Sequence, residues 1–355
     1  MDIRITTGAR RGERPADEAL GFGALFSEHL FAMDYSVEAG WHDARVEPRG
    51  DFRLDPAAAV FHYGQAMFEG CKAFRGVDGR VRLFRPDLHA RRMVAGAPRL
   101  CMQAPSEAQM LSALRALVQV DVDWVPGAEG TSLYLRPTLI ATEPFLGVRP
   151  SRQYRYFIIA SPAGSYFGGA GLTPVRIWVE RRDVRAPRGG LGATKAAANY
   201  VASLASSVKA QREGYDQVLW LDGQHHEYVE EVGTMNVCFV IGGALVTPSL
   251  SDSILAGVTR DSVLTLARER GLKVEERPVS LSELVSAHRG GHLTEVFGTG
   301  TAAVITPVGE LALGEERLVI GDGAPGPLAR AFSEDICAMQ RGLKPDRFGW
   351  LVEVA

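Results

Sequence analysis

The stretch GGAGLTP at residues 168–174 divides the sequence into two parts. It is short and rich in glycine and other small residues, a composition typical of a flexible linker between domains. On both sides of it, β-rich apolar runs are mixed with segments of helical periodicity. A chain of 355 residues is long enough for two domains that each have a core. We therefore predict a mixed α/β (α+β) fold with domains at residues 1–167 and 175–355.

The elements expected on each side of this linker follow from apolar periodicity and turn residues. Strands are expected at 71–75, 80–85, 131–141, 154–161, 175–180, 217–221, 237–241, 244–247 and 295–297, and helices at about 87–100, 106–119, 195–211, 258–270, 281–287 and 328–340. Asp87 and Ser106 are of the residue types that cap helix N-termini.

The composition excludes several classes of protein. With 39 basic and 42 acidic residues the net charge is −3, and 46% of residues are apolar, which excludes a disordered chain and argues against a nucleic-acid partner. No apolar run approaches the ~18 residues of a membrane span. The four cysteines form no CxxC pair, and the N-terminus lacks the apolar core of a signal peptide. A cytoplasmic protein without a membrane partner is expected.

Lys195 is a candidate for covalent chemistry. It follows the glycine-rich segment RGGLGAT at 188–194 and precedes AAANY at 196–200. Small neighbours would leave its amine little water, and desolvation lowers the pKa of a lysine, as a Schiff-base lysine requires. A surface lysine at a helix start fits the same pattern. A phosphate-binding P-loop does not fit, because the pattern GxxxxGK[ST] is absent.

Two adjacent acids, Glu230 and Glu231, precede the tight turn VGTMN at 232–236. Because neighbouring strand residues point to opposite faces, only one acid is expected to face inward, and a buried carboxylate needs a cationic partner. The residues alone do not say which acid it is, or exclude a solvated acidic loop. His225-His226-Glu227 lacks HExxH spacing, so no metal site is expected.

Three further features could hold an anion. The turn AGVT at 256–259 opens a predicted helix, whose free N–H groups favour negative charge. The turn GTGT at 298–301 offers consecutive small residues, and Arg92 could contact a phosphate in bidentate fashion. An amine, a carboxylate and phosphate contacts are together what pyridoxal 5′-phosphate requires.

Five stretches in order extend this reading: HYGQAMFEG at 62–70, RLFRP at 82–86, GTSLYLRP at 130–137, EVGTMN at 231–236 and FGTGTA at 297–302. With them the chain resembles the branched-chain amino acid aminotransferases, fold-type IV pyridoxal-phosphate enzymes, from about Gly21 to its end. The resemblance implies a small N-terminal and a larger C-terminal domain with the active site in the cleft between them. It also implies reversible transfer of the amino group of L-leucine, L-isoleucine or L-valine to 2-oxoglutarate, giving branched-chain 2-oxo acids and L-glutamate.

The resemblance assigns roles by position. Lys195, Glu231 and Tyr200 would be catalytic, with Lys195 bonded to the cofactor and acting as the base, Glu231 at the pyridine nitrogen and Tyr200 at the phenolic oxygen. Arg92, Val258, Thr259 and Thr301 would hold the phosphate. The substrate would meet Phe26, Tyr63, Phe68, Tyr134, Arg136, Tyr166, Thr234, Thr301 and Ala302. The side-chain carboxylate of glutamate needs a polar edge in this pocket, for which Lys72, Arg136 and Tyr63 are candidates.

The resemblance also implies a homodimer in which Leu146 and Val148 reach the partner subunit's pocket. Mammalian members carry a CxxC pair where this chain has Ala303 and Thr306, so thiol regulation at that site is not expected. The rival activities within the fold are those of D-amino acid aminotransferase and aminodeoxychorismate lyase, and a non-catalytic pyridoxal-phosphate carrier is a rival of another class. A dinucleotide-dependent oxidoreductase would need the glycine fingerprint that the chain lacks.

Overall fold

A computed structural model of the chain describes residues 1–8, 14–164 and 171–354. As far as it is described, the chain forms two compact units: unit 1 comprises Met1–Gly168, Thr194–Ala197 and Cys337–Ala355, and unit 2 comprises Gly169–Ala193 and Ala198–Ile336. Each is taken by itself below. Residues 168–170 of the expected linker lie outside the described residues. The division differs from the expected domains at Lys195 and at the C-terminal residues, both of which belong to unit 1.

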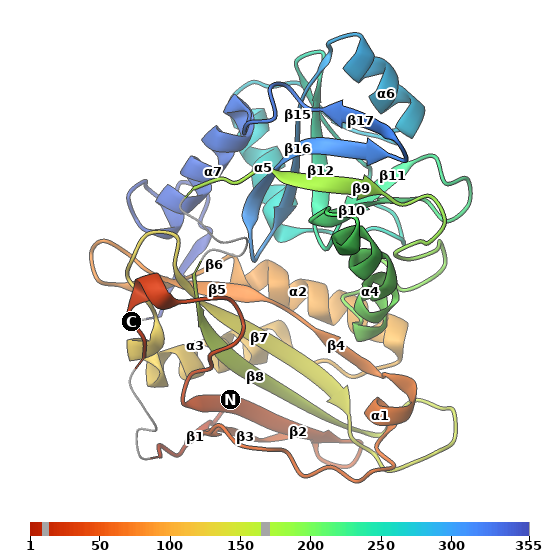
Figure 1. Cartoon of the computed structure of the whole chain (residues 1–355). Helices are drawn as coiled ribbons and strands as arrows, with labels where there is room; N and C mark the ends of the chain where they lie inside the picture. The colour runs from red at the N-terminus through yellow and green to blue at the C-terminus, as the bar shows by residue number, and fades with distance from the viewer. Residues whose placement is uncertain (9–13, 165–170, 355) are drawn as a thin grey trace. The chain divides into compact units, whose positions relative to one another are not determined.

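Unit 1 contains one mixed sheet in the order β1-β3-β2-β8-β7-β5-β6-β18, with β4 paired to β7 (Figure 1). Its strands are β1 Arg4–Ile5, β2 His29–Ser36, β3 Gly40–Pro48, β4 Ala66–Phe68, β5 Cys71–Arg75, β6 Val81–Phe84, β7 Ser132–Ala141, β8 Gln153–Ala163 and β18 Leu351–Glu353. The C-terminal residues join this unit because β18 pairs antiparallel with β6. The strands expected at 71–75 and 80–85 are confirmed as β5 and β6, which pair antiparallel as a hairpin.

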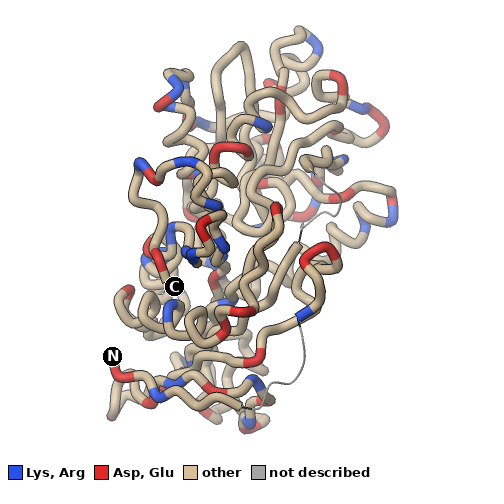
Figure 2. Tube along the Cα trace, turned by 90° about the vertical axis from the view of Figure 1, so that its left-hand side faces the viewer, with Lys and Arg blue, Asp and Glu red and all other residues tan. Residues whose placement is uncertain are grey.

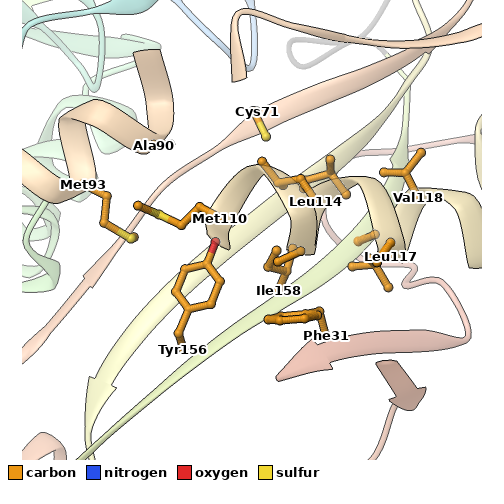
Figure 3. Close-up of a cluster of buried hydrophobic side chains, with 14 of the residues drawn as sticks. Phe31, Cys71, Ala90, Met93, Met110, Leu114, Leu117, Val118, Tyr156 and Ile158 are labelled. Carbon is orange, nitrogen blue, oxygen red and sulfur yellow. The ribbon is translucent and has the colours of Figure 1, made fainter. Parts of the chain in front are cut away.

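The helices of unit 1 are α1 Ala59–Tyr63, α2 Pro86–Gly96 and α3 Glu107–Val120, with 3-10 turns at Asp17–Ala19, Ala97–Leu100 and Val122–Trp124. Among them, α2 and α3 pack against one face of this sheet (Figure 3). Ser106 caps α3, as predicted, and the structure adds a capping box with Gln109. Asp87 does not cap α2; the helix begins one residue earlier at Pro86, a residue favoured at the first helical position.

The core of unit 1 lies between α2, α3 and the sheet. Figure 3 shows Met93 of α2 and Leu114 and Leu117 of α3 beside Phe31 and Ile158 of the strands, and all five side chains are at most 2% exposed. This packing determines which strand residues point the other way.

On β7, Leu133 and Leu135 belong to that core, so alternation turns Tyr134 and Arg136 to the opposite face. Lys72 on β5 is directly opposite Tyr134 and therefore shares its face. The sheet thus separates an apolar face from a face that carries tyrosine, arginine and lysine.

Unit 2 contains a second mixed sheet, in the order β11-β10-β9-β16-β15-β12-β13-β14, with β17 paired to β16. Its strands are β9 Val175–Val179, β10 Gln217–Leu221, β11 Val229–Val232, β12 Asn236–Ile241, β13 Ala244–Thr247, β14 Val274–Glu276, β15 Leu293–Gly300, β16 Val304–Leu313 and β17 Glu316–Val319. Its helices are α4 Ala197–Arg212, α5 Val258–Glu269, α6 Leu281–Arg289 and α7 Pro327–Gln340, and the division between the units falls within α4 and α7.

Acidic and basic residues are spread along the trace of both units (Figure 2). In the described residues, no helix combines the length and the apolar character needed to cross a bilayer.

Candidate active site

Lys195 lies beside β4 in unit 1. Its carbonyl oxygen accepts a hydrogen bond of 3.1 Å from the backbone N–H of Phe68, and Ala196 forms an antiparallel bridge with Met67. The residues that follow the glycine-rich segment thus pair with β4, and this backbone pairing fixes the position of Lys195.

The amine of Lys195 is held in an environment that disfavours its charge. Burial, and after it the neighbouring positive charge of Arg92, lowers the pKa of Lys195 from 10.5 to about 8, although Glu69 and Tyr134 act in the opposite direction. The Nζ atom lies 4.8 Å from the ring centroid of Phe68. The direction of this pKa shift is the one expected from the small residues around Lys195 in the sequence.

Arg92 on α2 forms a bidentate ion pair that the sequence did not reveal. Its Nε donates to Oε1 of Glu69 at 2.7 Å, and its Nη2 donates to Oε2 at 2.8 Å. His89, one turn earlier on α2, lies with Nδ1 3.1 Å from the same Oε2. The only sign of this cluster in the sequence is the spacing of His89 and Arg92, which puts them on one face of a helix.

Tyr134 and Arg136 lie on the polar face of the sheet. Arg136 Nη2 donates to the hydroxyl of Tyr134 at 3.1 Å, and its guanidinium lies 4.6 Å from the ring centroid of Phe68. A Cβ atom at Gly70 would lie 1.9 Å from the Tyr134 hydroxyl, so this hydroxyl occupies space that only glycine leaves open. Phe68, Tyr134, Arg136 and Lys195 are thus neighbours within unit 1.

In unit 2, both acids of β11 are buried, which corrects the prediction that only one faces inward. Both strand faces are covered here: Glu230 accepts a hydrogen bond from Ser253, and burial raises its pKa. Glu231 Oε1 accepts from the backbone N–H of Leu255 at 2.8 Å, and Oε2 lies 3.2 Å from Nε of Arg185. Arg185 is the cationic partner that a buried carboxylate requires, and the sequence analysis did not identify it.

The predicted phosphate turn is the N-terminus of α5. Gly257 precedes the helix, no side chain caps it, and Val258 and Thr259 occupy its first turn, where backbone N–H groups have no intrahelical acceptor. A Cβ at Gly257 would lie 1.9 Å from Oδ1 of Asn236, whose Nδ2 donates to the Leu255 carbonyl at 2.8 Å. The turn is therefore tightly braced and suited to an anion.

Thr301 and Ala302 lie in the tight turn that joins β15 to β16. Val304, at the end of this turn, has a positive φ of 58°, a conformation that β-branched residues rarely adopt. Strained backbone of this kind is found most often at functional sites.

The remaining predicted residues occupy several places. Tyr200 lies half-buried on α4, and Thr234 is exposed in the turn after β11. Phe26 precedes β2 and has its ring 5.1 Å from the guanidinium of Arg49. Tyr166 lies outside the described residues.

Leu146 and Val148 lie on the loop between β7 and β8 and are 65% and 88% exposed. Tyr63, at the end of α1, donates from its hydroxyl to the Leu146 carbonyl, and the backbone N–H of Phe145 donates to Ala57 at 3.0 Å. Tyr63 is thus attached to this loop.

A family model described as Amino-transferase class IV matches residues 66–311. The chain belongs to the class IV aminotransferases. A relative in this family, branched-chain-amino-acid transaminase 1 of Bacillus subtilis, is 52% identical over 96% of both chains. The branched-chain-amino-acid aminotransferase of Mycolicibacterium smegmatis is 48% identical over 94% of this chain and 92% of its own.

Solved structures of aminotransferases share the fold. The branched-chain enzyme of Escherichia coli is 27% identical with a TM-score of 0.78, over 93% of this chain and 100% of that one. The branched-chain enzyme of Thermobaculum terrenum, solved in its PLP-form, is 25% identical with a TM-score of 0.76, over 93% of this chain and 99% of that one. The predicted mixed α/β aminotransferase fold is confirmed.

Proposed function

We propose that this class IV aminotransferase transfers the amino group of L-leucine, L-isoleucine or L-valine reversibly to 2-oxoglutarate, yielding branched-chain 2-oxo acids and L-glutamate. The observation that carries the proposal is the buried Lys195 amine, with its pKa near 8, in a chain that is 52% identical to a branched-chain transaminase. A lysine with a pKa near 8 is partly neutral at physiological pH, and its neutral form can form a covalent bond to an aldehyde and accept a proton.

The donors present fit pyridoxal 5′-phosphate as the cofactor. Lys195 supplies the amine for its aldehyde, and Glu231 a buried carboxylate for its pyridine nitrogen. The N-terminus of α5, which no side chain caps, supplies backbone N–H groups for the phosphate. Gly257 precedes this helix and leaves room for the side chain of Asn236. Arg92 and Thr301 complete the phosphate contacts in the proposal. When bound, the cofactor supplies an electron sink that stabilises a carbanion at the substrate Cα.

Each residue then has a defined task. Nζ of Lys195 removes the proton from the substrate Cα and donates it to C4′ of the cofactor. Glu231, held by Arg185 and the Leu255 N–H, keeps a proton at the pyridine nitrogen. Tyr200 donates a hydrogen bond to the phenolic oxygen of the cofactor.

The substrate is held at both ends in this proposal. The backbone N–H groups of Thr301 and Ala302, with the Tyr134 hydroxyl, bind the α-carboxylate. The aliphatic side chain contacts an apolar pocket, where each buried methylene contributes ~0.8 kcal/mol. This pocket is formed by Phe26, Tyr63, Phe68, Tyr166, Thr234 and Ala302.

Glutamate requires a cation in the same pocket. Arg136 and Lys72 are favoured over Tyr63, because both share the sheet face of Tyr134, whereas Tyr63 hydrogen-bonds the loop that carries Leu146. An Arg136→Gln variant should lose activity toward 2-oxoglutarate while keeping its KM for L-leucine. An equal loss toward both substrates would remove Arg136 from this role.

The assembly we propose is a homodimer in which Leu146 and Val148 contact the partner's active site. Its support is the exposure of these two apolar side chains, because such groups are usually covered when they cluster. Leu146→Asp with Val148→Asp should give monomers in sedimentation experiments. We also place the protein in the cytoplasm, since its four cysteines are free thiols.

One experiment tests the reaction and its rivals. The purified protein should show a visible absorption band that changes on adding L-leucine, and 2-oxoglutarate should then restore the band and yield glutamate. A response to D-leucine alone would favour a D-amino acid aminotransferase, and a band that no amino acid changes would favour a non-catalytic carrier. Aminodeoxychorismate lyase activity would appear without any glutamate formation.

The catalytic assignments are tested by Lys195→Ala and Glu231→Gln. Lys195→Ala should fold and lose steady turnover. Glu231→Gln should retain the cofactor, because the phosphate contacts remain, and lose about 100-fold or more in kcat. Glu230→Gln is the matched control. A large loss in Glu230→Gln with little in Glu231→Gln would exchange the roles of the two acids.

A further inference from the structure

The carboxylate of Glu69 is buried and surrounded by donors in unit 1. The residue is 2% exposed, and its two oxygens meet Nε and Nη2 of Arg92, Nδ1 of His89 and the backbone N–H of Gly70 at 2.7–3.2 Å. Although burial alone would raise its pKa, Arg92 and His89 hold the pKa of Glu69 well below its usual range. The carboxylate is therefore ionised at neutral pH.

Glu69 also lies in the chain segment that holds Lys195. The preceding residue, Phe68, donates its N–H to the Lys195 carbonyl at 3.1 Å, and the N–H of Glu69 itself donates to Pro137 at 2.8 Å. The backbone of residues 68–69 is thus fixed on both sides. Phe68 hydrogen-bonds Lys195 through its backbone, and the side chain of Glu69 pairs with Arg92.

We infer that Glu69 and His89 are positioning residues that set the guanidinium of Arg92 for a phosphate. This inference rests on the proposed function, in which Arg92 contacts the cofactor phosphate. Neither residue has an assigned role in that proposal, and both act through Arg92.

The geometry supports this reading over a purely structural ion pair. A guanidinium is planar, with five N–H donors in a fixed arrangement, so two parallel bonds to Glu69 fix the plane of the whole group. The orientation of the guanidinium is then set before any ligand arrives. A flexible arginine would have to be ordered by the phosphate itself, and that ordering would weaken binding.

Stability alone does not call for this cluster. A buried ion pair is commonly no more stable than well-packed apolar residues of the same volume, because desolvation offsets the attraction. Here a histidine and a backbone N–H are added to the pair, and the charges of Arg92 and Glu69 both act on Lys195. These contacts maintain a cation of fixed direction beside the reactive amine.

The test compares the affinity of the apoenzyme for pyridoxal 5′-phosphate with its affinity for pyridoxal, which lacks the phosphate. Glu69→Gln should raise the Kd for pyridoxal phosphate about tenfold or more and the Kd for pyridoxal less than about twofold. Asp34→Asn is the matched control, because Asp34 pairs with Arg45 and Arg155 on the same sheet at 3.0 and 2.7 Å. It should change neither affinity.

His89 provides a second route if Glu69→Gln does not fold. Asparagine places an amide N–H near the position of Nδ1. His89→Asn should therefore have the same ratio of the Kd for pyridoxal phosphate to the Kd for pyridoxal as the unmodified protein. His89→Leu should lose affinity for pyridoxal phosphate alone. Equal losses for both aldehydes, or equal ratios in the two His89 variants, would overturn the inference. Failure of the unmodified protein to bind pyridoxal phosphate through Lys195 would instead overturn the proposed function.

Discussion

Replacing Lys195 with methionine should stabilise the apoenzyme at neutral pH. Methionine has a similar length and no charge to bury. The pKa of Lys195 is about 8 in the folded chain against 10.5 for an ordinary lysine, and at about 1.4 kcal/mol per unit the buried charge costs about 3 kcal/mol. The reactive lysine is therefore maintained at the expense of folding free energy.

The sign of the pH dependence follows from proton binding. Below about pH 8 both states hold the proton and the folded state bears the full cost. Between about pH 8 and 10.5 the unfolded lysine still binds its proton while the folded one does not, so stability rises with pH. The advantage of Lys195→Met should accordingly shrink by about 2 kcal/mol from about pH 7 to about pH 9.5.

Urea unfolding of the apoenzyme, followed by tryptophan fluorescence, measures this difference when the two proteins are compared at each pH. The same substitution at the exposed Lys209 controls for the loss of a lysine as such. A stability difference that stays constant over this pH range would refute the reasoning. So would a Lys195→Met protein that is less stable than the parent at pH 7.

Three shorter predictions concern other parts of unit 1. Gly70→Ala should displace the Tyr134 hydroxyl, which would lie 1.9 Å from the new Cβ, and raise the KM for L-leucine more than it lowers the thermal midpoint. Ser106→Ala removes the capping box of α3 and should cost about 1 kcal/mol in unfolding free energy, with kcat unchanged. In thiol titration of the native protein, the exposed Cys101 should react within minutes, while Cys71, buried and with its pKa raised, should react only after denaturation.

Much of the secondary structure could be predicted because its signals are local. Ser106 indicates the start of α3 by its own hydroxyl, and the turn at residues 77–79 indicates the hairpin of β5 and β6. The strands β2 and β3 were not predicted, because polar residues such as Asp34 and Arg45 interrupt their apolar pattern. These two residues form an ion pair at 3.0 Å between the strands. The pair depends on how the two strands are aligned, which the sequence alone does not show.

In the candidate site, too, local features could be predicted from the sequence and long-range contacts could not. Lys195 became a candidate because of its small neighbours in the sequence, although a surface lysine at a helix start fitted the same pattern. The burial of both Glu230 and Glu231 was not predicted, because it depends on Ser253 and Leu255, which reach β11 from a distant loop. Alternation along a strand says which way a side chain points, but not whether its other face is covered.

The two buried Glu–Arg pairs, one in each unit, follow one physical rule with the roles exchanged. In unit 1 the proposed ligand contact is the cation, Arg92, and Glu69 holds it; in unit 2 it is the anion, Glu231, and Arg185 lies 3.2 Å away. Without a counter-ion, a carboxylate in a desolvated site would take up a proton, and a guanidinium, which keeps its charge, would be costly to bury. The fold therefore has to supply each supporting residue, Glu69 for Arg92 and Arg185 for Glu231, from a distant position in the sequence. The charge of the ligand-binding residue determines where this partner must lie.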